Sequence, residues 1–205
     1  MKSKQEQRSE ETKMLILQSA ANLFAKKGYD AVTIREIAKD AGCSHTAIYL
    51  YFKDKETLLH QLSLPPLHQL QQKLKAISTL DSLTSESKLK EISLEYISFC
   101  LKHRNMYDIF FNAKSSRVDK KPELEVNQLR FEIFELLKSI IEENLFISND
   151  EQLLAFSRIY YYQLNGVLST YSYQHEPHDV LMERLKPTFN LAIEVLLLGF
   201  QEKLK

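Results

Sequence analysis

The sequence predicts an all-α protein in which a small N-terminal helical domain precedes a larger helical domain. The chain of 205 residues contains only four Gly and five Pro, too few for the frequent tight turns of a β fold. Apolar residues recur at spacings of three and four, which is the period of an α-helix. Hydrophobic residues make up 44% of the chain, enough to bury a core. We therefore expect two helical domains, residues 1–62 and 63–205.

Composition and charge narrow the class of protein. The net charge is zero, which argues against a nonspecific coat for nucleic acid, although residues 1–62 hold ten Lys/Arg against eight Asp/Glu. The apolar run at residues 195–200 is far shorter than the roughly 20 residues of a membrane span, and the polar first residues do not form a signal peptide. Cys43 and Cys100 lack the spacing of metal ligands. We expect a cytoplasmic protein with reduced thiols, no membrane contact, no metal and no cofactor.

Three helices are expected near the start of the chain. The first covers residues 10–27, and its apolar positions share one face: Met14, Leu17, Ala20, Ala21 and Phe24. Gly28 should end it in a left-handed conformation. Thr33-Ile34-Arg35-Glu36 has the form of a capping box, so a second helix should run from there to Ala41. Gly42 provides a sharp turn, and Ser44 is a suitable N-cap for a third helix over residues 45–52.

Two short helices joined by a turn of about three residues, with the second polar at its start, are typical of a helix-turn-helix. Four side chains would project from the start and outer face of the third helix, where they can reach base edges and phosphates in the major groove: His45, Thr46, Tyr49 and Tyr51. For the two tyrosines the alternative is packing, and for the histidine it is an ordinary surface position.

The inner side of this third helix should carry Ile48 and Phe52. Asp54 would cap a fourth helix, whose first turn holds Lys55 beside free backbone N–H groups. Both the ammonium and those N–H groups suit a phosphate.

The stretch from Ile16 to Leu59 resembles the DNA-binding region of the TetR-like (TetR/AcrR) repressor family. The matching positions are Ala20-Ala21-x-Leu23-Phe24, Gly28-Tyr29, Thr33, Ile37-Ala38, Ala41-Gly42-Cys43-Ser44, Tyr49, Tyr51-Phe52 and Lys55. The resemblance implies phosphate contacts by Thr33, Ser44, Tyr49 and Lys55, and base recognition by His45, Thr46 and Arg35. Family members often carry Gly-Thr where this chain has Thr46-Ala47, so Thr46 is the candidate replacement for the missing hydroxyl.

The larger domain should begin near Pro65-Pro66, because proline removes an N–H and clashes with the preceding turn. We expect this pair to kink or break the fourth helix, which continues at helical spacing to residue 77. Further helices are expected at residues 86–103, 105–113, 122–147, 150–174 and 178–203.

The resemblance implies that this half of the chain binds a small effector and dimerises through its last two helices. The residues agree, since the segments 156–173 and 191–200 are apolar on more than one face. A helix of that kind must be buried on both sides. One side can cover the core while the other meets a second subunit.

Aromatic and polar groups among apolar neighbours are the candidates for an effector pocket, which would suit a flat, lipophilic or aromatic ligand. They are Phe99, Cys100, His103, Tyr107, Phe110, Phe111, Phe131, Phe134, Tyr161, Gln163 and Asn165. The alternative is that these residues simply form the core. The cluster from His175 to Asp179 has side chains of the types that bind metals, but Pro177 makes it a connector between helices.

These observations lead to one functional hypothesis, a homodimeric DNA-binding transcriptional repressor. It would bind a near-palindromic operator in double-stranded DNA and be released by a small-molecule effector. A helical enzyme is the rival class, but the sequence offers neither a catalytic or metal constellation nor a Gly-rich phosphate loop. A protein-interaction module would not explain a capped helix-turn-helix with a polar outer face.

Overall fold

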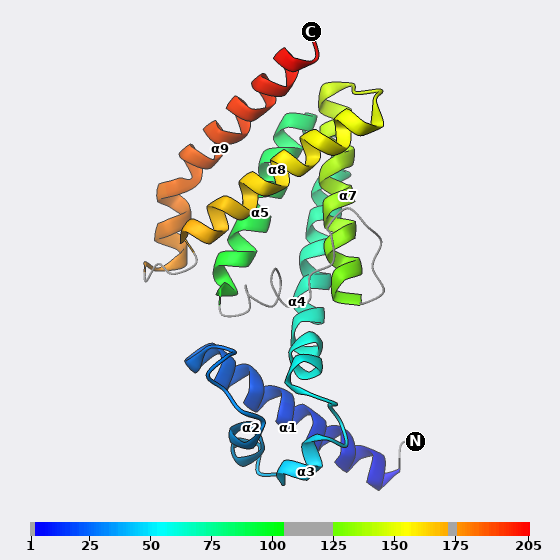
Figure 1. Ribbon diagram of the computed structural model, residues 1–205, viewed down its shortest axis with the longest axis vertical. Coiled ribbons are helices and arrows are strands. Elements are labelled where there is room, and N and C mark those ends of the chain that lie inside the picture. Colours follow the sequence, from blue (N-terminus) through cyan, green and yellow to red (C-terminus); the bar gives the residue numbers. More distant parts are fainter. Residues whose placement is uncertain (1–2, 105–124, 172–175) are drawn as a thin grey trace. The chain divides into compact units, whose positions relative to one another are not determined.

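The protein folds into helices, as the sequence predicts. The computed structural model describes residues 3–104, 125–171 and 176–205, and no strand occurs within these ranges. The described residues form two compact units, one ending at Pro66 and the other beginning at Leu67 (Figure 1). The helix expected at residues 105–113 lies outside the described residues. None of the described helices is long and apolar enough to cross a membrane.

The first unit contains α1 (Lys4–Lys27), α2 (Ile34–Asp40), α3 (His45–Ile48) and the start of α4 (Lys55–Ser78). Side chains from all four helices and from the segments between them meet in one core: Ile16, Ala20, Phe24, Val32, Ile37, Ala38, Ile48, Phe52, Leu58 and Leu59. Two expected inward positions, Ile48 and Phe52, are fully buried. The prediction for Met14 is wrong, because its side chain is 69% exposed. The buried stripe follows the i, i+4 row of Ile16, Ala20 and Phe24, which faces away from Met14.

Capping determines where these helices begin and end. α1 starts six residues earlier than expected, because Ser3 and Glu6 form a capping box. Gly28 ends α1 with a positive φ of 80°, and Gly42 has a φ of 68° in the turn between α2 and α3. Both glycines therefore occupy the left-handed region that the sequence assigns to them. Asp54 caps α4 as predicted, accepting a hydrogen bond from the Thr57 backbone N–H at 2.7 Å.

α4 runs without interruption through Pro65 and Pro66, so the expected helix break is wrong. Proline inside a helix costs about 3 kcal/mol, and burial on both sides of the pair opposes that cost. Leu58 and Leu59 are fully buried before the prolines, and three leucines are buried after them: Leu67, Leu70 and Leu74. The helix thus belongs to both units, and the predicted domain boundary at residues 62 and 63 lies within it.

The second unit consists of the rest of α4 with α5 (Ser85–Lys102), α7 (Glu125–Leu145), α8 (Asp150–Tyr171) and α9 (His178–Lys203). α5 packs against α7, α8 and α9 (Figure 1). Each helix buries one face, as its apolar period requires. A polar contact also fixes this core, since the hydroxyls of Ser93 and Tyr160 lie 2.6 Å apart in the interior.

Candidate nucleic-acid interface

The recognition segment, residues 44–52, is built by local hydrogen bonds. Ser44 caps α3 as predicted, its hydroxyl accepting from the Ala47 N–H at 3.1 Å. The helix ends at Ile48 rather than at the expected residue 52, since Tyr49 forms its C-cap. The backbone continues to turn, because the N–H of Leu50 donates to the Ala47 carbonyl at 3.2 Å and that of Phe52 to Ile48 at 2.9 Å. The segment therefore keeps a helical sense beyond its short α-helix.

Four of the predicted DNA-contacting side chains lie exposed on this segment: Ser44, His45, Thr46 and Tyr49. Tyr49 is 49% exposed, so core packing does not account for it. Its ring meets that of His45 edge to face, with centroids 5.2 Å apart. This contact restrains both rings, which leaves an imidazole and a phenol presented together to solvent.

Tyr51 combines the two roles that the sequence left open. Its half-buried side chain packs against the core of the first unit. Its hydroxyl accepts a hydrogen bond of 3.2 Å from the exposed Ser9 hydroxyl on α1. Because Ser9 is the donor, the Tyr51 O–H can still donate to another acceptor.

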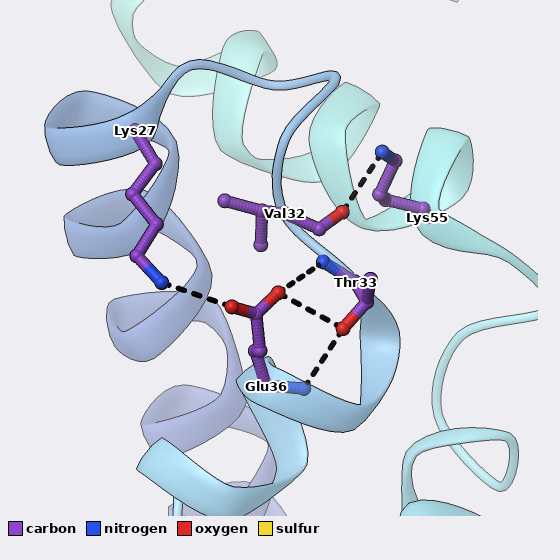
Figure 2. A network of polar contacts seen from close by, with 5 residues as sticks. All are labelled: Lys27, Val32, Thr33, Glu36 and Lys55. Atoms are coloured by element: carbon purple, nitrogen blue, oxygen red, sulfur yellow. Dashed lines mark hydrogen bonds and ion pairs between the residues drawn. The ribbon is translucent and has the colours of Figure 1, made fainter.

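Thr33 and Glu36 form the predicted capping box at the start of α2 (Figure 2). The Thr33 hydroxyl accepts from the Glu36 N–H at 3.2 Å and donates to the Glu36 carboxylate at 2.9 Å. Lys27 completes the network with an ion pair of 2.9 Å to that carboxylate. Hydrogen bonds from Lys27 and then from Thr33 lower the pKa of Glu36 to about 2. The Thr33 hydroxyl is therefore already engaged as a donor, while Arg35 on the same helix lies exposed.

Lys55 holds the loop between α1 and α2. Its ammonium donates to the backbone carbonyls of Tyr29 at 2.9 Å and Val32 at 3.0 Å, and the second of these bonds is drawn in Figure 2. It also lies 4.1 Å from the centre of the Tyr29 ring, a cation–π contact. Burial, followed by the charges of Glu56, Asp54 and Asp30, raises the pKa of the Tyr29 phenol. The predicted phosphate contact would have to use the remaining N–H of this ammonium.

Leu50 is the residue of this surface that the sequence analysis did not single out. It is 80% exposed, whereas Ile48 and Phe52 on either side are fully buried. An apolar residue between two inward-facing positions of a helix-turn-helix is the signal that could have identified it.

Part of the first unit is similar to a known family of proteins. Residues 16–62 match the model of the TetR family of bacterial regulatory proteins. Over these residues the chain is similar to the TetR family. The matched range contains α2, α3 and every residue predicted above to contact DNA.

The chain is also similar to proteins that are named as HTH-type transcriptional regulators or repressors. It is 53% identical over 49 residues to YerO of Bacillus subtilis, an uncharacterized HTH-type transcriptional regulator, covering 24% of this chain and 17% of YerO. It is 30% identical over 116 residues to the HTH-type transcriptional repressor KstR2 of Mycolicibacterium smegmatis, covering 56% and 55% of the two chains. The chain thus spans about a sixth of the first relative and about half of the second.

Solved structures show that the fold extends over both units. The regulator FadR of Bacillus subtilis, solved with stearoyl-CoA, aligns with a TM-score of 0.62 at 22% identity, covering 90% of this chain and 97% of FadR. The fatty acid degradation regulator FadR of Bacillus halodurans aligns with a TM-score of 0.63 at 18% identity, covering 86% and 93%. At these identities the likeness shows the helical fold alone.

The effector candidates predicted from the sequence lie in separate places in the second unit. Phe99 and His103 lie with ring centroids 4.6 Å apart and line a cavity of about 410 Å³ between α4, α5 and α9. Burial, and then the charge of Lys102, lowers the pKa of His103. Cys100 is buried in the core on the same helix. Tyr107, Phe110 and Phe111 lie outside the described residues.

The remaining candidates belong to α7 and α8. Phe134 is fully buried and meets Tyr161 edge to face at 5.8 Å, and Asn165 donates to the Tyr161 carbonyl at 2.8 Å. Phe131 is half-buried. Gln163 instead lines a groove between α8 and α9. It lies on the other side of α8 from Tyr161, two residues earlier, which packs against Phe134.

Polar residues that the sequence analysis missed lie near Tyr161. Arg130 donates to the Asn127 side chain at 2.8 Å, and burial lowers the pKa of its guanidinium. Burial raises the pKa of the Tyr161 phenol, while hydrogen bonds with Tyr96 and Asn165 oppose that shift. The signal in the sequence was a polar pair three residues apart within the otherwise apolar stripe of α7.

The outer faces of α8 and α9 remain apolar and exposed, as the sequence predicts for helices with two apolar sides. Exposed large hydrophobic residues on these helices are Ile159, Tyr162, Val180, Leu191, Val195 and Leu198. Between the helices lies a groove of about 680 Å³. At one side of it, Phe156 and Phe200 stack with ring planes 8° apart.

Proposed function

We propose that this protein is a homodimeric transcriptional repressor of the TetR family that binds a near-palindromic operator and leaves it when a small effector binds. One observation carries the proposal: two capped helices present the exposed polar side chains of His45, Thr46 and Tyr49 on a fully packed scaffold. A rigid scaffold fixes where these donors and acceptors lie. That is what recognition of base edges in the major groove requires.

The proposed roles follow the chemistry of each side chain. Arg35, His45 and Thr46 recognise bases, and the hydroxyl or ammonium groups of Thr33, Ser44, Tyr49, Tyr51 and Lys55 contact phosphates. Tyr49 and Tyr51 keep an O–H available for donation. Thr33 and Lys55 make their contacts in addition to the bonds that already hold them. Phosphate contacts set the register of the protein, and base contacts set its sequence preference.

We propose that dimerisation uses the exposed faces of α8 and α9. Leu191, Val195 and Leu198 are each more than half exposed in the single chain, although apolar patches of this kind are usually covered in a soluble protein. Two antiparallel helices from each subunit would close a four-helix interface. A symmetric dimer would then present two copies of α3 to successive major grooves, about 34–36 Å apart.

The proposed effector is lipophilic and carries a polar or anionic group. Aromatic side chains supply the apolar surface, and Arg130 with its Asn127 partner places a cationic group within the same unit. The stearoyl-CoA in the FadR structure and the fatty acid regulator among the structural relatives support this class. A long-chain acyl-CoA is therefore the first compound to test.

Selection from a pool of random duplexes tests the DNA-binding proposal. We expect the purified chain to select one inverted repeat at modest salt and to sediment as a dimer. Tyr49→Phe, which removes one hydroxyl, should weaken binding to every duplex, whereas Tyr171→Phe, the same change at a half-buried residue of α8, should not. A monomer that selects no duplex would contradict the proposal.

A second experiment tests release by an effector. Stearoyl-CoA should raise the Tm of the protein and reduce its affinity for the selected duplex, since a ligand shifts an equilibrium only through its different affinities for the two states. Arg130→Met should weaken both effects. A Tm that does not respond to stearoyl-CoA would exclude this class of effector while leaving DNA binding intact.

A further inference from the structure

Leu50 occupies an unusual position for a large apolar residue. It is 80% exposed, the highest exposure of any described large hydrophobic residue in the first unit. Its neighbours on the chain do not shield it, since Tyr49 is also exposed and Tyr51 points its ring toward the core. Packing in the folded chain therefore does not explain why this position is apolar.

The backbone places Leu50 beside Ala47. The Leu50 N–H donates to the Ala47 carbonyl at 3.2 Å, which is the i to i+3 bond of a 3₁₀ turn. In such a turn the side chains at i and i+3 lie directly in line. Ala47 is half-buried and Leu50 exposed, so the two form a short apolar strip along the recognition segment.

This strip lies among polar groups proposed to face DNA. Thr46 precedes Ala47, and Tyr49 precedes Leu50, both exposed. Base edges in the major groove present hydrogen-bond donors and acceptors, and only thymine presents an apolar group there, its C5-methyl. The thymine C5-methyl is therefore the one group on the base edges that an apolar strip in the major groove can contact favourably.

We propose that Leu50, in line with Ala47, recognises the 5-methyl group of a thymine in each half of the operator. The inference rests on the proposed DNA-binding function and adds a specificity-determining residue to it. Burial of a methyl-sized group against apolar carbon favours binding by about fourfold. A dimer makes the contact twice, so the two half-sites together should contribute about fifteenfold.

Deoxyuridine substitution tests this contact, because it removes the thymine methyl and leaves every hydrogen-bonding group of the base in place. The duplex selected by the wild-type protein is prepared with each thymine pair replaced in turn by deoxyuridine. We expect one symmetric pair of positions at which the wild-type affinity falls by about fifteenfold. At that pair, Leu50→Ala should bind the thymine and deoxyuridine duplexes equally.

Two further variants separate the contact from general effects. Leu50→Met keeps an apolar side chain and should retain most of the thymine preference. Leu80→Ala makes the same change as Leu50→Ala at an exposed leucine of the second unit, and should respond to deoxyuridine as the wild-type protein does. Because Leu50 is exposed, its replacement should leave the Tm unchanged.

The possible outcomes are distinct. Equal deoxyuridine effects in the wild-type protein and Leu50→Ala, or no effect at any position, would overturn the thymine contact while leaving operator binding established. Failure of the wild-type protein to select any duplex would overturn the proposed function and this inference with it.

Discussion

Replacing Lys55 by methionine should lower the free energy of unfolding by about 2 kcal/mol. The substitution keeps most of the aliphatic stem and removes the ammonium, which donates to two backbone carbonyls at 2.9 and 3.0 Å and lies over the Tyr29 ring. One hydrogen bond from a charged group contributes about 1.5–3 kcal/mol, and an exposed cation–π contact about 0.5–1 kcal/mol. The ammonium is only half-buried and lies at the unfavourable end of a helix dipole, so we count the two carbonyl bonds together as one and expect the low end of the sum, about 2 kcal/mol.

Urea denaturation followed by circular dichroism measures this change. Lys53→Met is the matched control, because Lys53 is an exposed lysine two residues earlier and should change stability by less than about 0.5 kcal/mol. If Lys55→Met unfolds at the same urea concentration as Lys53→Met, the two carbonyl bonds do not hold the loop.

The same variant separates the structural role of Lys55 from its proposed phosphate contact. Loss of a phosphate contact lowers the slope of log affinity against log salt by about one per contact, whereas loosening of the loop alone weakens binding without changing that slope. We expect the lower slope in Lys55→Met. A weaker complex with an unchanged slope would leave Lys55 with its structural role alone.

Four other substitutions test separate parts of the account. The pKa of the Glu36 carboxylate is lowered from an ordinary 4.5 to about 2, so the ionised group stabilises the folded state above pH 4.5 and this stabilisation is lost as the pH falls toward 2. The Tm of Glu36→Gln should therefore vary less over this pH range than that of the wild-type protein. Parallel curves of Tm against pH for the two proteins would contradict the network of Lys27, Thr33 and Glu36. Ser93→Ala leaves the buried Tyr160 hydroxyl without its partner at 2.6 Å and should cost about 1–3 kcal/mol in urea denaturation; a cost near zero would mean that water replaces the bond. Leu198→Glu should yield a monomer in sedimentation velocity, and a persistent dimer would place the interface elsewhere. His45→Ala should alter the preference among competing duplexes, and an unaltered preference would remove His45 from base recognition.

Local signals in the sequence predicted most of the first unit. The capping box at Thr33, the N-cap at Ser44 and the turn at Gly42 each depend on residues within three or four positions, so they can be identified without the fold. The helix period likewise predicted which sides of α8 and α9 would be apolar. The exposed recognition segment follows from these features.

Contacts between distant residues could not be predicted in the same way. Lys55 bonds carbonyls 23 and 26 residues away, and Ser9 reaches Tyr51 across 42 residues. Only the fold brings such groups together. The length of α4 could not be predicted either. It depends on tertiary burial, because buried leucines before and after Pro65 and Pro66 stabilise the helix across the two prolines.

The effector candidates show why side-chain type alone does not locate a pocket. Phe134 and Tyr161 pair within the second unit, whereas Gln163, two residues after Tyr161, lines the groove of the opposite face. Neighbouring positions on a helix point in different directions. The sequence of a helix therefore identifies its aromatic residues, but only the fold shows which of them pack together and which residues line a groove.

Interference by methylation of guanine N7 in the selected duplex tests most directly whether α3 occupies the major groove, presented twice by a symmetric dimer. N7 lies in that groove, so a methyl group there blocks an approaching side chain. We predict two clusters of interfering guanines centred about 10 base pairs apart, or a multiple of this spacing. Binding that tolerates N7 methylation at every position, or a single cluster of interference, would contradict the account.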